Sequence, residues 1–258
     1  MDLIRLAGFI FVFVFFGLSV IFIALRRRGF GFVLRDIPAF IKIKEAINSS
    51  VETGSRLHLS LGSGGIIGME NAPALVGFSM LERVARLASE SDKPPLTTSG
   101  NASLTILSQD TLNSTYKDMG LTNRTDPVAN RITGFTPFSY VAGVMPIVLD
   151  EQLSTNILIG HYAGEIALIN DASSRKGVLT IAGTDDVAGQ AIAFATADEP
   201  LIGEELFAGS AYLTPDPLHN ASLLAEDVMR WLVVVGILLG IVINIFGMDQ
   251  LLTSILGR

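Results

Sequence analysis

Two long runs without a charged residue, one near each end of the chain, constrain the fold more than any other feature. The first run spans residues 6–25 and the second spans residues 231–248. A helix needs roughly 17 to 25 predominantly apolar residues to cross the hydrocarbon core of a bilayer. Both runs have this length, and 49% of the chain is hydrophobic. The sequence therefore predicts two membrane-spanning helices around a central domain.

The first run shares one property with a secretory signal, because Arg5 precedes it and such signals begin with basic residues. Its apolar core is longer than the roughly 7 to 15 residues of a signal, and no small-residue cleavage pattern follows it. It ends instead in the three arginines of residues 26–28. We interpret residues 1–28 as an uncleaved anchor with a basic flank, and residues 227–258 as a second anchor with a short tail.

The positive residues predict the orientation of these spans. Only Arg5 and Arg258 lie outside the region between the spans. Close to the spans, this region carries seven basic residues: Arg26, Arg27, Arg28, Arg35, Lys42, Lys44 and Arg230. Basic residues next to a span favour the cytoplasmic side of a membrane. The prediction is a cell-membrane protein with two spans, a cytoplasmic main domain and both termini outside.

The second run contains a pair of glycines at a spacing that lets two membrane helices approach closely. Gly236 and Gly240 are four residues apart, and Asn244 follows on the same helical face. Small residues at this spacing and a polar side chain within a span both favour helix association. We therefore take these three residues as candidate oligomer contacts. The alternative is that they are ordinary glycines of a membrane helix.

The domain between the spans, residues 51–226, is acidic. It contains 20 acidic and 9 basic residues, a net charge of −11. Such a surface repels nucleic-acid backbones, so no nucleic-acid partner is expected. The basic residues that precede it favour contact with anionic lipid. The chain has no cysteine, which excludes disulfides, thiolate metal sites and thiol catalysis.

Residues 29–50 are predicted to contain a juxtamembrane amphipathic helix, with Pro38 in its first turn. The apolar residues Ile37, Phe40 and Ile41 alternate with Lys42 and Lys44. This mixture suits a helix at the membrane interface. It equally suits a helix that packs on the domain.

The central stretch alternates predicted strands with predicted helices. The expected strands are residues 56–61, 96–100, 156–160 and 178–182, and the expected helices are residues 71–87, 101–119, 165–174, 186–194 and 204–213. Residues 120–135 are expected to form a loop, and residues 138–149 a buried helix or strand. This repetition predicts an α/β fold, a Rossmann-like three-layer domain with a mostly parallel sheet, flanked by N- and C-terminal transmembrane helices.

Ligands of open parallel sheets bind outside the carboxyl ends of the strands. Residues that directly follow the predicted strands are therefore the candidate ligand-binding residues: Gly62, Ser63, Gly64, Gly65, Ser99, Asn101, His161, Glu165, Thr184, Asp185 and Asp186. The glycines are the strongest indication among them, because backbone N–H groups without side chains can bind phosphate beside a helix start. The dinucleotide pattern is incomplete, since Ile67 occupies the position of its last glycine. The alternative is a tight turn that lets a helix pack closely.

Two other kinds of site are weaker hypotheses. Asp185 and Asp186, together with Glu204 and Glu205, are oxygen ligands of the type that Mg²⁺ or Ca²⁺ takes. Adjacent acidic residues point in different directions, however, and Asp186 also suits a helix N-cap, so no metal is predicted. His161 has the chemistry of a general base. No serine in a strand-to-helix elbow motif accompanies it, so no catalytic residues are predicted.

Three segments carry a family resemblance. Residues 51–65, Leu107–Asn113 and Ile202–Phe207 resemble a family of uncharacterised prokaryotic membrane proteins, a domain of unknown function with terminal transmembrane helices around a Rossmann-like domain. The resemblance implies this architecture for nearly the whole chain. It implies no activity, substrate or cofactor.

The expected function is that of a membrane-anchored oligomeric scaffold or partner-binding subunit, without catalysis. Its expected partners are the lipid bilayer and either further copies of the chain or another membrane protein. The alternative is a cytoplasmic sensor or enzyme that binds a nucleotide-like or other small anionic ligand at the glycine loop. A transporter subunit is disfavoured, because the spans contain no charged residue to form an ion path.

Overall fold

The computed structural model describes residues 3–27, 35–66, 71–91, 93–124, 126–213 and 217–245. The chain divides into two compact units. One comprises residues 1–35 and 216–258, and the other comprises residues 36–215. Ile67 and Gly68, which follow the predicted glycine turn, lie outside the described residues.

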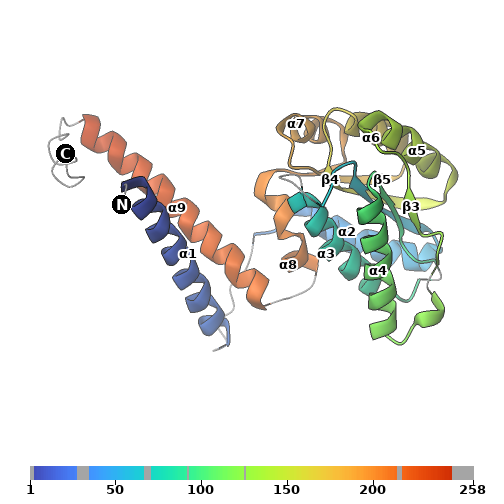
Figure 1. The fold of residues 1–258 in the computed structure, drawn as a ribbon, viewed down its shortest axis with the longest axis horizontal. Helices are drawn as coiled ribbons and strands as arrows, with labels where there is room; N and C mark the ends of the chain where they lie inside the picture. Colours follow the sequence, from blue (N-terminus) through green and yellow to red (C-terminus); the bar gives the residue numbers. More distant parts are fainter. Residues whose placement is uncertain are drawn as a thin grey trace. The chain divides into compact units, whose positions relative to one another are not determined.

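The first unit contains two long helices, α1 (Leu3–Arg27) and α9 (Pro217–Ile245). They contact each other and run antiparallel, so that the start of α1 lies beside the later part of α9 (Figure 1). Each includes a segment long and apolar enough to cross a membrane, residues 8–25 with a mean hydropathy of 2.8 and residues 220–245 with 2.4. α9 begins at Pro217, ahead of the apolar run, because proline fits the first helical turn, where its missing N–H has no partner to lose.

The second unit is built on a six-stranded parallel sheet in the order β3-β2-β1-β4-β5-β6. The strands are β1 (Arg56–Gly62), β2 (Leu96–Ser99), β3 (Asn130–Ile132), β4 (Leu153–His161), β5 (Leu179–Gly183) and β6 (Glu199–Leu201). The chain fills one half of the sheet outward from β1 and then returns to the centre with β4. The strand order therefore reverses between β1 and β4, which is the point where doubly wound sheets bind ligands.

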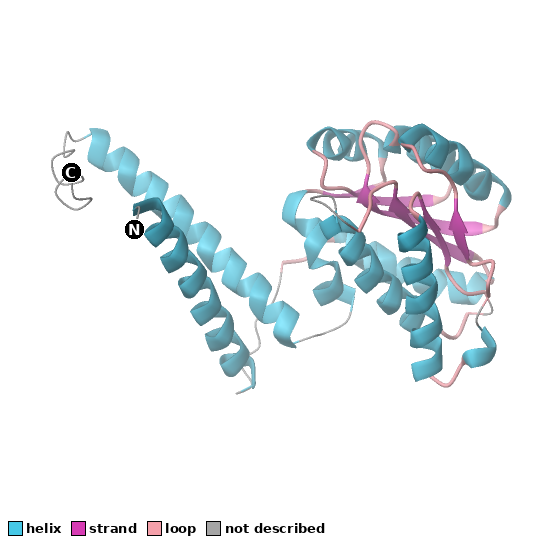
Figure 2. Ribbon diagram, in the orientation of Figure 1, coloured by secondary structure: helices cyan, strands magenta, loops and turns pink. Residues whose placement is uncertain are grey.

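Helices cover both faces of this sheet, which gives three layers (Figure 2). One layer contains α2 (Pro38–Thr53), α3 (Asn71–Leu87), α4 (Ala102–Asp118) and α8 (Gly209–Leu213). The other contains α5 (Pro137–Asp150), α6 (Ile166–Lys176) and α7 (Val187–Thr196). Because helices cover both faces of the sheet, the central strands β1 and β4 are buried over almost their whole length. This burial explains why these strands are rich in apolar residues. The predicted α/β class with a parallel sheet is confirmed.

α2 packs on the sheet of the second unit. Its buried side chains include Phe40, Ile43 and Ile47, and it contacts β1, β4 and β6. Lys42 and Lys44 lie on its exposed face. The sequence left open whether this helix lies at the membrane interface or packs on the domain. In the structure its apolar face packs on the domain.

Two strands were missing from the sequence prediction, which expected four. β3 lies within the predicted loop of residues 120–135, and β6 lies between α7 and the following 3-10 helix, η2 (Gly203–Ala208). Each strand has three residues and forms an edge of the sheet. Edge strands need no long apolar run, and they tolerate a proline such as Pro200, because one side of the strand has no ladder partner.

The structure also defines two segments, residues 138–149 and residues 204–213, whose predicted secondary structure was ambiguous or different. Residues 138–149, expected as helix or strand, belong to α5, which begins at a capping box formed by Thr136 and Ser139. The capping box satisfies the first N–H groups and so favours the helix. Residues 204–213, expected as one helix, form η2 followed by the short α8.

Candidate functional site

The candidate site is the carboxyl edge of the sheet at β1 and β4, which we call the crevice because doubly wound sheets bind ligands in a crevice at this point. Gly62 and His161 are register partners at the ends of these two strands. The chain leaves β1 toward the layer that contains α3, and it leaves β4 toward the layer that contains α6. The two lips of the crevice are therefore residues 62–66 and residues 161–165.

Gly62 is required at the floor of this crevice. Its φ is 77°, a left-handed conformation that favours glycine, and a Cβ there would lie 2.6 Å from the carbonyl oxygen of His161. Gly160 has the same constraint from the other strand, since a Cβ would collide with the carbonyl of Leu61. The backbones of β1 and β4 thus approach each other more closely here than any side chain permits.

Two other glycines, Gly77 and Gly100, allow the close packing that was the alternative explanation for the glycine segment. A Cβ on Gly77 of α3 would meet the side chain of Leu61 at 2.5 Å. A Cβ on Gly100 would lie 2.8 Å from Cα of Ser63, and the N–H of Gly100 donates to the carbonyl of Gly62 over 2.9 Å. These contacts hold α3 and the end of β2 against the start of the glycine segment.

The two candidates that follow β2 serve the start of α4. Ser99 Oγ lies 2.6 Å from Oγ1 of Thr105 and 3.2 Å from the carbonyl oxygen of Asn101. The Asn101 side chain accepts a bond from the N–H of Ser103 over 2.9 Å, as an N-cap does. Both side chains are therefore engaged in local structure.

The three candidate residues that follow β5 have different roles: two form bonds of the local structure, and one side chain lies at the crevice. Thr184 Oγ1 accepts from the N–H of Tyr162 and donates to its carbonyl, over 3.0 and 2.8 Å. Asp186 caps α7 by accepting from the N–H of Gly189 over 2.7 Å. Asp185 points elsewhere, because its Oδ1 lies 2.8 Å from Nδ1 of His161, and both side chains are 26% exposed. Of the three, Asp185 is the one that joins β4 to β5 at the crevice.

Glu165 differs from the other candidates. It precedes α6 and is 5% exposed, yet its side chain does not cap that helix. Its carboxylate forms no hydrogen bond or ion pair with another described residue. It is a largely buried residue in the segment that joins β4 to α6.

The crevice edge is acidic. The described residues that connect each strand to the following helix include Glu165, Asp185 and Asp186 but no lysine or arginine. The opposite edge holds the basic residues, where Arg56 pairs with Asp126 over 2.7 Å and Arg131 pairs with Glu151 over 2.7 Å. Within the described ranges, no three His, Asp or Glu side chains are grouped so that they can hold a metal ion.

A buried polar network lies beneath the glycine segment, on the sheet face covered by α5 and α6. Its members are fully or almost fully buried: His58, Ser60, Thr98, Tyr140, Asn156, Tyr162 and Ser173. Tyr162 donates to Ser60 Oγ over 2.6 Å, and the Tyr140 hydroxyl bonds to both Ser60 and Thr98. Ser60 lies two residues before Gly62 on β1, so the network ends close to the glycine at the carboxyl end of this strand.

The hydrogen-bond partners fix the proton positions on His58. Ser173 Oγ donates to the carbonyl of Ile169 over 3.0 Å, so it accepts from the Asn156 amide over 2.9 Å. The Asn156 oxygen, 2.7 Å from His58 Nδ1, then requires a proton on that nitrogen. His58 Nε2 accepts from Thr98 Oγ1 over 2.9 Å. Burial lowers the pKa of His58 to about 4, so the imidazole is neutral.

Sequence reasoning placed His58 in a strand and did not find this network. The available signal was the alternation of His58 and Ser60 with the leucines of β1. In a strand buried on both faces, that alternation predicts polar side chains on one covered face, which must find partners. The partners come from β2, β4, α5 and α6, far away in the chain.

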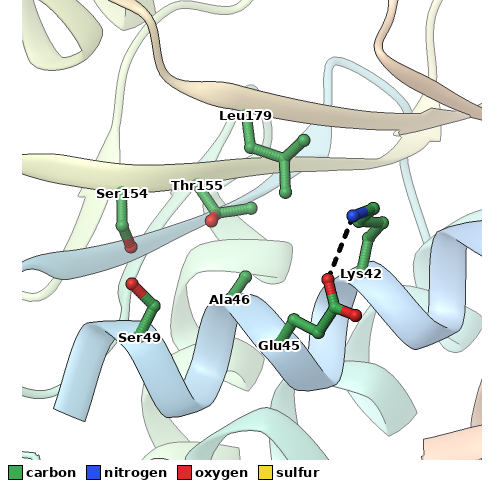
Figure 3. Close-up of a pocket in the computed structure, with 7 residues that line it drawn as sticks. All are labelled: Lys42, Glu45, Ala46, Ser49, Ser154, Thr155 and Leu179. Atoms are coloured by element: carbon green, nitrogen blue, oxygen red, sulfur yellow. Dashed lines mark hydrogen bonds and ion pairs between the residues drawn. The ribbon is translucent and has the colours of Figure 1, made fainter. Parts of the chain in front are cut away.

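A second concavity lies under α2, at the amino ends of β4 and β5. It has a volume of about 290 Å³ and is lined by Lys42, Glu45, Ala46, Ser49, Ser154, Thr155 and Leu179. Lys42 pairs with Glu45 over 3.0 Å, and the hydroxyls of Ser49 and Ser154 face each other (Figure 3). The Ser154 hydroxyl has no partner among the described residues. This pocket is at the opposite edge of the sheet from the crevice.

The predicted oligomer contacts lie on α9. A Cβ added to Gly236 or Gly240 would meet no described atom within 4 Å, so the contact between α1 and α9 does not use the space beside these glycines. Asn244 is exposed. The groove between α1 and α9 is lined by larger side chains, among them Phe11 and Leu232.

Together, these features define a doubly wound α/β domain with a crevice at its switch point, flanked by two apolar helices. The chain belongs to the family described as "Domain of unknown function (DUF6754)", whose model matches residues 1–255. Searches of the curated proteins and of the solved structures found no match. The resemblance to an uncharacterised domain family that covers nearly the whole chain is confirmed.

Proposed function

We propose that the α/β domain binds a small, nucleotide-sized ligand in the crevice between β1 and β4. The observation that carries this proposal is the position of Gly62. It combines a left-handed φ, a backbone approach that excludes any side chain, and a place at the point where the strand order reverses. A turn with these properties presents backbone N–H groups to an anionic group of a ligand.

The proposed role is binding or sensing rather than catalysis. Ser99, Asn101 and Thr184 each satisfy a bond of the local structure, which leaves them unsuited to act on a substrate. The glycine lip supplies backbone donors, and the opposite lip supplies the His161–Asp185 pair and the Glu165 carboxylate. These two chemistries suit a ligand that carries both acceptor and donor groups.

A thermal-unfolding panel tests the proposal. Nucleotides, phosphorylated metabolites and amino acids are added to the full chain in mild detergent. A compound at 100 times its dissociation constant adds about 2.7 kcal/mol of stability. For a domain of this size, that corresponds to a rise of roughly 5 to 10 °C in Tm. If no compound in the panel raises the Tm, the proposal fails.

We further propose that α1 and α9 hold this domain at the cytoplasmic face of the cell membrane, with both termini outside. Their apolar segments are almost wholly exposed within the chain, with 0% and 6% of each buried. In water that surface costs about 25 cal/mol per Å², whereas in a bilayer it costs nothing. The arginines of residues 26–28, at the end of the first apolar run, support the cytoplasmic placement of the domain.

A second candidate function is self-association through α7, as expected of a scaffold. Val187 is 80% exposed and Phe194 is 71% exposed, and Ala188, Ala191 and Ala195 lie on the same open side. α7 contains no charged residue, although the domain carries a net charge of −11. A charge-free face lets two copies of an acidic domain meet without bringing like charges together. The open glycines of α9 support the same function.

A further inference from the structure

The layer formed by α5, α6 and α7 has two uncovered flanks. α6 contacts both α5 and α7 and lies between them (Figure 1). Because the strands are all parallel and each helix returns the chain to the start of the next strand, the three helices run in the same direction. α5 and α7 therefore form the flanks, and no described helix of this layer covers either of them.

The flank formed by α5 is apolar and exposed. Residues 132–149 contain no charged residue. Phe135 is 75% exposed and Phe138 is 74% exposed. Ala142 and Pro146 follow Phe138 at the four-residue spacing that places side chains on one side of a helix, and both are exposed. We call these four residues the α5 face, and grouped exposed apolar residues of this kind mark interaction sites more often than single ones do.

The flank formed by α7 has the same character. Its helix carries no charge, and its exposed apolar residues form the α7 face: Val187, Ala188, Ala191, Phe194 and Ala195. The middle helix is different, because its exposed side carries the ion pair between Asp171 and Arg175, at 2.8 Å. The layer thus has charged residues on its middle helix and apolar surface at both flanks.

The charge of the domain indicates what covers these faces. Residues 51–226 carry a net charge of −11, so two copies repel each other wherever their acidic surfaces meet. The two flanks are the places where copies can come together without that repulsion. An anionic lipid surface is a poorer partner, because its negative charge is spread over an area wider than one face. A second copy of this chain is therefore the partner that both faces fit.

A contact between unlike faces uses both of them, whereas a contact between like faces does not. If the α7 faces of two copies meet about a two-fold axis, the α5 face of each copy stays exposed. If the α7 face of one copy meets the α5 face of the next, every inner copy has both faces covered. The second arrangement also continues the layer, because α7 then lies between two neighbouring helices, as α6 does within one copy.

We propose that copies of this chain assemble head to tail, with the α7 face of one copy packed on the α5 face of the next. A contact between unlike faces gives a closed ring when the rotation between copies closes, and an open row when it does not. Anchoring in one membrane by α1 and α9 gives all copies the same side up and raises their local concentration. This inference rests on self-association through α7, the second candidate function, and names the surface that α7 contacts.

Disulfide cross-linking tests the proposal, since the chain contains no cysteine. Ala142→Cys lies on the α5 face and Ala191→Cys on the α7 face, and both replace small, exposed side chains. The two full-length variants are co-expressed with different tags, and their membranes are oxidised with copper phenanthroline. We expect a cross-linked pair that carries both tags, and no cross-linked pair when either variant is expressed alone.

The variant that carries both cysteines should form a ladder of cross-linked copies. A bond within one copy is excluded, because α6 lies between the two positions, neighbouring helix axes are about 8 to 10 Å apart, and a disulfide needs Cα atoms within roughly 7 Å. The matched control pairs Ala191→Cys with Ile106→Cys, which is 68% exposed on α4 in the other layer. The α5–α7 pair should give at least 10-fold more cross-linked product than this control.

Phe138→Asp provides a second measurement, because it places a charge on the α5 face without a cysteine. Its mass by light scattering in detergent should fall below that of the unmodified chain. An unchanged mass, or cross-linking no greater than in the control, overturns the head-to-tail contact.

The outcomes also separate this inference from the function on which it rests. Cross-linking of Ala191→Cys to itself, with none to Ala142→Cys, would show that α7 meets α7. It would overturn the head-to-tail contact and leave self-association through α7 in place. A monomeric unmodified chain would overturn both.

Discussion

Nδ1 of His58 donates its proton to Oδ1 of Asn156 over 2.7 Å, at the centre of the parallel sheet. The two residues are 98 positions apart in the chain and lie opposite each other on β1 and β4. This bond joins the two strands that form the floor of the crevice. The neutral state of the imidazole is therefore linked to the integrity of the proposed site.

Stability should fall as the pH drops from about 6.5 toward 4. Burial lowers the pKa of His58 to about 4 in the folded chain, whereas the unfolded chain binds this proton near pH 6.5. The unfolded state thus binds more protons across this range, so the contribution of His58 is complete above pH 6.5 and is lost as the pH falls. The expected loss is roughly 3 kcal/mol. Denaturant unfolding at pH 7.5 and pH 4.5 measures it.

The three histidines of the chain allow a direct check of this assignment. In ¹⁵N spectra of histidine-labelled protein, one imidazole should show a protonated Nδ1 and remain neutral at pH 5. Titration of all three side chains between pH 6 and pH 7 is the result that contradicts the assignment.

The tyrosine and serine hydroxyls beneath Gly62 should act as a unit. Ser60→Ala leaves the buried Tyr162 hydroxyl without its partner, at a cost of about 1 to 3 kcal/mol, whereas Tyr162→Phe leaves Ser60 bonded to Tyr140 and should cost less. The double variant removes both groups, so its cost should be lower than the sum of the two by at least about 0.5 kcal/mol. A double-mutant cycle by urea unfolding measures this difference, and strict additivity would show that the bond contributes nothing.

Gly62 should be far less tolerant of a side chain than Gly120, although both have positive φ values of 77° and 72°. An alanine at Gly120 meets no described atom within 4 Å, so it costs only the roughly 1 kcal/mol of a left-handed conformation. At Gly62 the added Cβ also meets the backbone of His161, which cannot yield as a side chain can. We expect Gly62→Ala to cost at least about 2 kcal/mol more than Gly120→Ala in urea unfolding. Equal costs would contradict the close approach of the two strands.

If α7 forms contacts between copies, Val187→Asp and Phe194→Asp should disrupt them. Each places a charge on the charge-free face, where a second acidic domain would approach it. Ile106→Asp is the matched control, because Ile106 is 68% exposed and lies on α4. Light scattering in detergent should give a lower mass for both α7 variants and an unchanged mass for the control. A monomeric unmodified chain contradicts self-association altogether.

The orientation in the membrane can be tested with single cysteines, since the chain contains none. Ser114→Cys lies on the exposed side of α4, and Ser254→Cys lies in the short tail after the second apolar run. A membrane-impermeant maleimide applied to intact cells should label Ser254→Cys and spare Ser114→Cys until the cells are opened. The reverse pattern places the domain outside.

The central part of the fold could be predicted because its signals are local. β1, β4 and β5 are apolar runs, and the glycines after β1 mark the turn that precedes α3. β3 and β6 could not be predicted, because three-residue edge strands such as Glu199–Leu201 are defined by their neighbour in the sheet and not by their own composition.

The candidate site was predictable in position but not in the role of each residue. Topology alone places His161 and Asp185 at one edge, and the structure joins them. The separate roles of Asp185 and Asp186 depend on side-chain direction, which the sequence indicates only through the capping preference of aspartate. Nothing in the sequence distinguishes the buried Glu165 from an exposed glutamate, because its burial results from packing of the whole layer.

Amide hydrogen exchange of the full chain in detergent, with and without a compound that raises its Tm, locates the ligand site. We predict slower exchange in residues 62–66 and 161–165, which form the two lips of the crevice. Protection confined to the amino-edge pocket, around Ser49, Ser154 and Leu179, would contradict it and place the ligand site under α2.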